Sequence, residues 1–165
     1  MASLAALPQT AETLLGLFVT QLEAQGVDLP SRRYVSNGPM LVADGEELTL
    51  SLQSITRGMP GVVLGFSQDP HVVTFFATWA LFLVRKAPVI QTRPRGAQIP
   101  SAKSINNFGQ QAMADVAALV QAAQQIHMQY RLTAPEEGFA IGAASTLEPA
   151  GGLAGVRLLL ETTVD

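Results

Sequence analysis

The sequence contains no cysteine among its 165 residues. Disulfide bonds and thiolate chemistry are therefore excluded, and a zinc site would have to be built from histidine and carboxylates alone. There are only two histidines, His71 and His127, and they fall in different predicted elements with no third ligand at a metal-binding spacing. We interpret both as surface or capping residues, and we predict no metal site and no cofactor.

Charged residues are scarce as well. Asp, Glu, Lys and Arg make up 14% of the chain, against about 25% in a typical domain. Neighbouring subunits could cover part of the surface, or the Ala- and Gly-rich composition could simply reflect a high-GC genome. The net charge is −3 and the sequence has no basic stripe, so sequence-independent clamping of nucleic acid through phosphate neutralisation is not expected.

Long apolar runs are missing too. The most apolar stretch, Val72 to Val84, contains two threonines and is too short to span a membrane as a helix. The N-terminal residues lack the basic region of a signal peptide. We therefore expect no membrane association, and a protein made and used in a cytoplasm.

The patterns that are present predict a single α+β domain over residues 1–165. Apolar residues at helical spacing predict one helix over residues 10–25, capped by Thr10 and ended by Gly26, and a long helix over residues 101–129. Alternating or apolar runs predict strands over residues 33–36, 48–52, 72–85, 138–145 and 156–164. This order favours a mixed, mainly antiparallel sheet with the N-terminal helix and the long helix on one face.

Further expectations concern packing and loops. The strand over residues 72–85 is apolar on both sides, so it should be covered on both, either at the centre of the sheet or with one face on a partner. The strand at 48–52 alternates and should be half-buried. Gly109 in the long helix is a candidate for close packing. Residues 87–100 and 149–152 are expected to be loops, the latter a loose one.

We find no catalytic constellation in the sequence. The carboxylates Asp44, Glu46 and Glu47 lie at a turn, where such residues are ordinarily solvated. Arg93 and Arg95 lie among prolines, and we favour a solvated or subunit-contacting loop over a contact with a phosphate backbone. We therefore predict that the protein is not an enzyme.

The segment RRYVSNGPMLVADGEELTLSL, residues 32–52, combines paired arginines with acidic residues. Two turns, at Asn37-Gly38-Pro39 and at Asp44-Gly45, are expected to deliver a short strand into a longer one, as a hairpin would. Opposite charges in a charge-poor chain are candidates for pairing across a subunit joint. The predicted interface residues are Arg32, Arg33, Asp44, Glu46 and Glu47, with Arg93 and Arg95 as further candidates.

Four stretches carry a family resemblance. They are LPSRRYVSNG (29–38), the D-x-E-x-L element at 44–48, LFLVRKAP (81–88) and PEEGFAIG (135–142). In this order they resemble the tail-terminator or tail-completion proteins of long-tailed phages, in particular those of actinobacterial phages. One departure is that the family pattern often places a cysteine inside the acidic element, where this chain has Gly45.

The resemblance implies a structural virion protein that forms a ring, typically a hexamer, on the last ring of the tail tube. The ring would end tube polymerisation and join the tail to the head. Its expected partners are copies of itself, the tail tube protein and the head–tail connector or stopper proteins. It would be assembled in the host cytoplasm and reside at the head–tail junction of the virion.

DNA would pass through the lumen of such a ring without sequence-specific binding, which suits a negative net charge. Two alternatives stay open. The protein could be another neck component, such as a stopper or head-completion protein. It could also be a small-molecule-binding or hydrolytic α+β domain, which a buried carboxylate with a strongly shifted pKa in a deep pocket would favour.

Charge reversal at Arg33 or at Glu46 is the first test of the predicted joint. Either reversal alone should impair ring or junction assembly while leaving the monomer folded, because the opposite charge on the neighbouring subunit would lose its partner. Assembly is measured by size-exclusion chromatography and electron microscopy, and folding by circular dichroism. Normal assembly of both variants would show that the segment is only a solvated hairpin.

Overall fold

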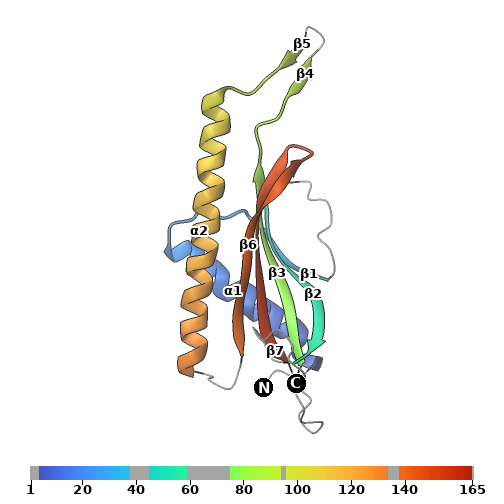
Figure 1. The fold of residues 1–165 in the computed structure, drawn as a ribbon, viewed down its shortest axis with the longest axis vertical. Helices are drawn as coiled ribbons and strands as arrows, with labels where there is room; N and C mark the ends of the chain where they lie inside the picture. The colour runs from blue at the N-terminus through green and yellow to red at the C-terminus, as the bar shows by residue number, and fades with distance from the viewer. Residues whose placement is uncertain (1–3, 38–44, 59–74, 94–95, 134–137, 165) are drawn as a thin grey trace.

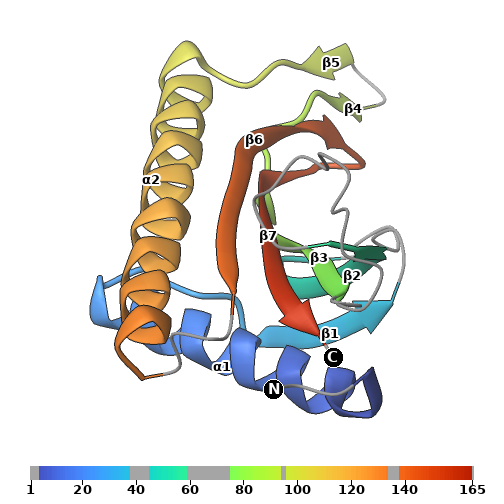
Figure 2. The same cartoon turned by 60° about the horizontal axis from the view of Figure 1, so that its bottom comes forward.

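A five-stranded sheet of order β1-β2-β3-β7-β6 forms the centre of the protein (Figures 1 and 2). The computed structural model describes residues 4–37, 45–58, 75–93, 96–133 and 138–164. The strands are β1 (Arg32–Asn37), β2 (Glu47–Arg57), β3 (Phe75–Lys86), β6 (Phe139–Ala150) and β7 (Leu153–Val164). Only β1 and β2 pair in parallel, and the other neighbours are antiparallel. The predicted α+β class with a mixed, mainly antiparallel sheet is confirmed.

Two helices cover one face of this sheet (Figure 2). After a short 3-10 turn (η1, Leu4–Ala6), α1 spans Leu7–Ala24, and α2 spans Ala102–Thr133 between β5 and β6. Their buried side chains form one core with the helix-facing side of the strands. The largest fully buried members are Phe18, Leu14 and Leu22 of α1, Leu119 and Ile126 of α2, and Leu48, Leu50, Trp79, Leu81, Leu83, Leu158 and Leu160 of the sheet.

The N-terminal helix begins earlier than predicted. Thr10 is not the N-cap: it lies inside α1, where its hydroxyl donates to the carbonyl of Ala6 at 3.1 Å, and a proline at the first helical turn favours the earlier start. The predicted end is confirmed. Gly26 has φ 75°, and the N–H of Val27 donates to the carbonyl of Leu22 at 3.0 Å, which is the closing pattern of a Schellman motif.

The segment over residues 32–52 is not a hairpin, because β1 and β2 run in the same direction. A parallel pair requires the chain to return along the length of β1 before β2 begins. The six residues of β1 span about 20 Å, and residues 38–46 between the strands are long enough, when extended, to cover that distance. Asn37 is the last residue of β1. The rest of the first predicted turn, Gly38 and Pro39, and Asp44 of the second lie outside the described residues.

Burial of β2 also differs from the prediction. The sequence predicts a half-buried strand, but residues 47–51 are buried on both faces, with Glu47, Thr49 and Ser51 each 0% exposed. For β3 the prediction of double coverage is confirmed, and the strand is central. Its odd-numbered apolar residues face the helices, whereas Ala80, Phe82 and Val84 form a second buried cluster on the opposite face.

Two predicted loops have regular structure. Residues 87–100 contain a small hairpin, β4 (Gln91–Arg93) paired with β5 (Gly96–Gln98), which lies beyond the β6–β7 turn at the top of Figure 1. Residues 149–152 are not a loose loop. Gly151 and Gly152 have φ 60° and 81° and form a tight turn that joins β6 directly to β7, because two successive positive φ values match the twist of a two-residue hairpin.

The long helix packs over only part of its length. Its first 13 residues, 102–114, include no buried side chain, so about 20 Å of helix lies outside the core. Ile105, predicted to be on the buried stripe, is 53% exposed. Gly109 does not mark close packing, since a Cβ built on it would meet nothing within 4 Å. The predicted stripe is correct from Val116 onward, where Val116 packs against the core and Leu119, Ala123 and Ile126 are buried in it.

Two glycine-to-alanine substitutions should have opposite effects on stability. Gly155→Ala should destabilise the protein by about 1–3 kcal/mol, because the new methyl group would clash with the carbonyl oxygen of Leu83 and lie 3.0 Å from Cα of Val84. Gly109→Ala should stabilise it by about 0.5–1 kcal/mol, as expected for an unobstructed helical position. Urea unfolding measures both. Equal effects of the two substitutions would contradict the close approach of β3 and β7.

Candidate assembly surfaces

The acidic and basic residues of the 32–52 segment meet within the subunit. Arg32 and Glu47 are register partners on β1 and β2, and their side chains lie 3.6 Å apart. Tyr34 donates to Glu47 Oε1 at 2.9 Å and Thr49 donates to it at 3.2 Å. Because the Glu47 carboxylate is fully buried among these partners, its role in the isolated subunit is to fix the β1–β2 pair.

Arg33 and Glu46 lie closer to the surface. Arg33 bonds Glu23 of α1 at 2.9 Å and the carbonyl of Pro30 at 2.9 Å. Glu46 accepts the backbone N–H of Lys86 at 3.1 Å. Exposed contacts of this kind contribute about 0–1 kcal/mol to stability, so both side chains could be reversed without unfolding the subunit. Pairing across a joint stays a prediction for these two residues.

The remaining predicted interface residues are only partly described. Asp44 and Arg95 lie outside the described residues. Arg93 is placed as the last residue of β4, paired with Gly96, but its side chain is not described. The described members of the predicted set therefore fall into two separate groups. Arg32, Arg33, Glu46 and Glu47 lie at β1 and β2, and Arg93 lies on the distant β4–β5 hairpin. The sequence did not distinguish the two groups.

A buried ion pair that the sequence patterns did not predict connects the sheet to α2. Arg85, near the end of β3, donates to Asp115 through two hydrogen bonds, at 2.6 and 3.0 Å. Gln111 donates to the same carboxylate at 3.0 Å, and Arg85 also reaches the carbonyl of Asp28 at 3.0 Å. The signal in the sequence is Asp115, the only acidic residue in the long helix, which falls on its buried side.

This pairing keeps Arg85 charged. The hydrogen bonds that Arg85 donates to Asp115 raise the pKa of the Arg85 guanidinium above its ordinary value and outweigh the desolvation that burial imposes. A raised pKa on a basic group stabilises the fold at every pH below the unfolded-state pKa. That contribution is lost only as the pH rises through the folded-state pKa, so neutral and acidic conditions leave the Arg85 side of the pair intact.

The described residues include no cluster of side chains that could hold a metal ion. Histidine, cysteine, aspartate and glutamate nowhere gather in threes among them. His127 Nδ1 lies 3.0 Å from the carbonyl of Phe139, so it joins α2 to β6, and His71 is outside the described residues. Trp79 is a core residue whose indole N–H donates to Thr162 at 2.9 Å. Within the described chain, no helix has both the length and the apolarity to cross a membrane.

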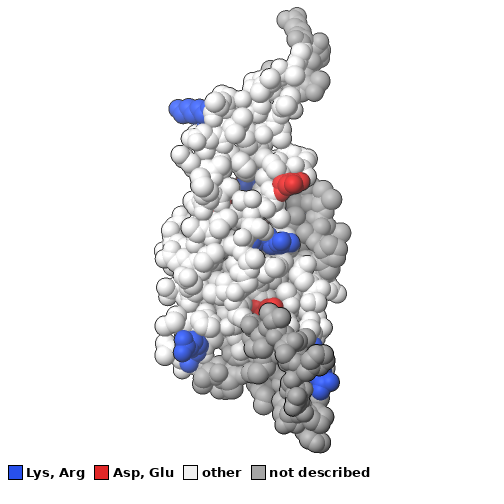
Figure 3. All heavy atoms as spheres, in the orientation of Figure 1, with Lys and Arg blue, Asp and Glu red and all other residues white. Residues whose placement is uncertain are grey.

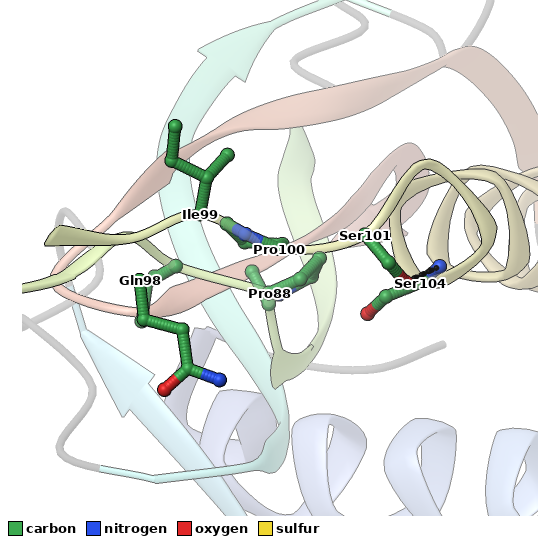
Figure 4. A pocket seen from close by; sticks show the side chains of 8 residues that line it. Pro88, Gln98, Ile99, Pro100, Ser101 and Ser104 are labelled. Atoms are coloured by element: carbon green, nitrogen blue, oxygen red, sulfur yellow. Dashed lines mark hydrogen bonds between the residues drawn. The ribbon is translucent and has the colours of Figure 1, made fainter.

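Five exposed large apolar side chains lie beside the β4–β5 hairpin and on the start of α2. We define residues 87–114 as the arm. Its exposed large side chains are Val89, Ile90, Ile99, Ile105 and Met113, which are 41–71% exposed. At its base Pro88 and Pro100 line one hollow, and Ile99 and Gln98 project to opposite sides of the chain (Figure 4). The two prolines restrict the backbone there.

The base of the arm is fixed to the body. The N–H of Ala87 donates to the carbonyl of Gly152 at 2.8 Å, and the side chain of Val89 lies beside the same glycine in the β6–β7 turn. At the other side of the base, the Ser101 hydroxyl accepts the N–H of Ser104 at 3.1 Å and caps α2. The arm is therefore a held projection whose apolar side chains face outward.

The outer side of α2 forms a second surface. Between Lys103 and Arg131 the only charged residue of the helix is Asp115, which is buried, so the exposed side of 27 residues carries no charge. Charged side chains are few and scattered over the visible face of the molecule (Figure 3). The exposed line along this side of the helix consists of Gln110, Met113, Ala117, Gln121, Gln124 and Met128.

Comparison with protein-family models and with curated proteins finds no match for the chain. The functional argument therefore depends on the geometry of the chain itself and on the resemblance of its short motifs.

Asp115→Ala tests whether the buried ion pair holds α2 to the sheet. Removing the carboxylate leaves the Arg85 charge without its partner in a largely buried position. The free energy of unfolding, measured with urea, should fall by about 3–5 kcal/mol. The double variant Arg85→Met with Asp115→Leu should lose much less, because neither position then carries an uncompensated charge. A loss below about 1 kcal/mol in the single variant would show that the pair contributes no more than a surface ion pair.

Proposed function

We propose that the protein is a structural virion subunit that forms a ring on the end of a phage tail tube, ends tube polymerisation and joins the tail to the head. In this role it works by binding, without bond chemistry. Its partners are other copies of the same chain, the tail tube protein and the connector or stopper proteins of the neck. DNA crosses the lumen of the ring without sequence-specific contacts.

The observation that carries this proposal is the combination of an outward-facing apolar arm with an uncharged outer side of α2. A monomer that functions alone ordinarily covers such a helix with charged side chains. Here Ile90, Ile99 and Met113 are each more than 60% exposed. Surfaces of this kind are typical of subunits that bury them in an assembly.

The hydrolytic or small-molecule alternative receives less support. Glu47 is a buried carboxylate whose Oε1 accepts hydrogen bonds from Tyr34 and Thr49. Its Oε2 lies 3.6 Å from Arg32 and has no hydrogen-bond partner among the described residues. It lines neither the hollow at the base of the arm nor the hollow between α1 and β1. An internal, hydrogen-bonded carboxylate of this kind fixes a fold more readily than it serves as a general base.

Loss of the protein from a phage should give overlong tails, because nothing would stop addition of the tube protein. Electron microscopy of particles made without it measures tail length directly. Adding the purified protein to growing tubes should stop elongation at one ring per tube end.

The result also separates the neck alternatives. Tails of normal length beside heads that leak DNA would assign the protein to the stopper or head-completion position instead. A chain that stays strictly monomeric and never caps tubes would contradict the proposal.

A further inference from the structure

The β4–β5 hairpin lacks the interactions that would keep it folded alone. Each strand has three residues, and all of β5 is exposed. A two-stranded hairpin without a covering layer is marginally stable in water. Ile90 and Ile99, 63% and 71% exposed, flank it without packing on the core of their own subunit. The arm therefore presents apolar side chains that the described part of its own subunit leaves uncovered.

The charge of the chain is divided unevenly between the arm and the body. The arm carries three basic residues, Arg93, Arg95 and Lys103, and no acidic residue. The whole chain has 10 basic and 13 acidic residues, so the remainder has 7 basic and 13 acidic ones, a net charge of −6. A basic arm is thus complementary to the body of another copy of the same chain. A DNA backbone would match the charge but would leave the isoleucines uncovered.

The body offers a matching surface between α1 and β1. A hollow there is lined by Leu15, Gly16, Val19, Tyr34 and Val35 and by two charged residues, Glu12 and Arg33. The Arg33 charge is already paired with Glu23 at 2.9 Å. Glu12 is exposed and makes no ion pair within the described part of the chain. Among the described strands, β1 is an end strand of the sheet, and an end strand is the position at which a further strand can be added.

We propose that the arm of one subunit docks into the α1–β1 hollow of the next copy, with its isoleucines on the apolar floor and its basic side chains near Glu12. This inference rests on the ring assembly proposed above and names the joint that makes it. The donating and accepting surfaces differ, so the contact is heterologous and can propagate from subunit to subunit until the ring closes.

Cysteine cross-linking tests the joint directly, because the chain contains no cysteine of its own. The double variant Gly16→Cys/Ile99→Cys places one thiol in the hollow and one on the arm. Both sites tolerate the change: Ile99 is 71% exposed, and a Cβ on Gly16 would meet nothing within 4 Å. Oxidation, or a short bismaleimide, should give a ladder of covalent oligomers on a denaturing gel, ending at the size of the ring.

The matched control is Gln124→Cys/Ile99→Cys, which moves the body thiol to an exposed helical position on α2. It should give no ladder. Cross-linking of this control would place the arm on the outer side of α2. Dimers formed by the single variant Ile99→Cys would indicate a contact between two arms. Either result would overturn the proposal. Rings seen by electron microscopy without a 16–99 cross-link would overturn the joint while leaving the proposed ring function standing.

A second comparison uses two exposed isoleucines. Ile99→Asp should raise the concentration needed for assembly more than tenfold, whereas Ile55→Asp, 42% exposed on β2, should leave it unchanged. Unchanged circular dichroism in both variants shows that the monomer still folds. Equal effects of the two substitutions would overturn the assignment. Binding of duplex DNA by the wild-type protein would also overturn the assignment under two conditions. The binding would have to weaken with added salt, and Arg93→Ala and Arg95→Ala would have to abolish it without affecting assembly.

Discussion

The buried contact between Arg85 and Asp115 determines how the sheet and the helix α2 are placed relative to each other. It joins the end of the central strand β3 to the middle of α2, and through the carbonyl of Asp28 it reaches the connection between α1 and β1. The pair has two hydrogen bonds of its own, and Gln111 adds a third to the carboxylate. A charge pair with this many partners has one favourable geometry, so it fixes the position of α2 along the sheet.

The division of α2 follows from that contact. C-terminal to Asp115, side chains such as Leu119 and Ile126 are buried in the core, and N-terminal to it none is buried. The first part of the helix and the β4–β5 hairpin therefore project as one piece whose base is held at the β6–β7 turn. A segment whose base is already held in place loses less conformational entropy on binding than a free loop does. This is why the arm is a better candidate for a subunit contact than the charged residues of the 32–52 segment.

Glu47, one of the predicted interface residues, has a different role in the structure from the one predicted, because it is buried. In the sequence Glu47 looks like a solvated turn residue, because it follows Gly45 and another glutamate. In the structure it begins a strand whose outward face is covered, and it accepts hydrogen bonds from Tyr34 and Thr49. One opposite-charge pair of the segment, Arg32 with Glu47, lies inside the subunit and not across a joint. Pairing across a joint stays a prediction for Arg33 and Glu46.

The sequence by itself determined the α+β class, both helices, the five strands of the sheet and the double coverage of β3, because apolar periodicity of 2 or 3.6 residues is a local property. It did not determine the parallel direction of β1 and β2, since strand direction depends on where the connection crosses and not on side-chain alternation. Nor could it show that Ile105 is exposed while Asp115 is buried, because both fit a helical stripe. Only the tertiary structure decided how far α2 overlaps the sheet, and with it which apolar residues are left for a partner.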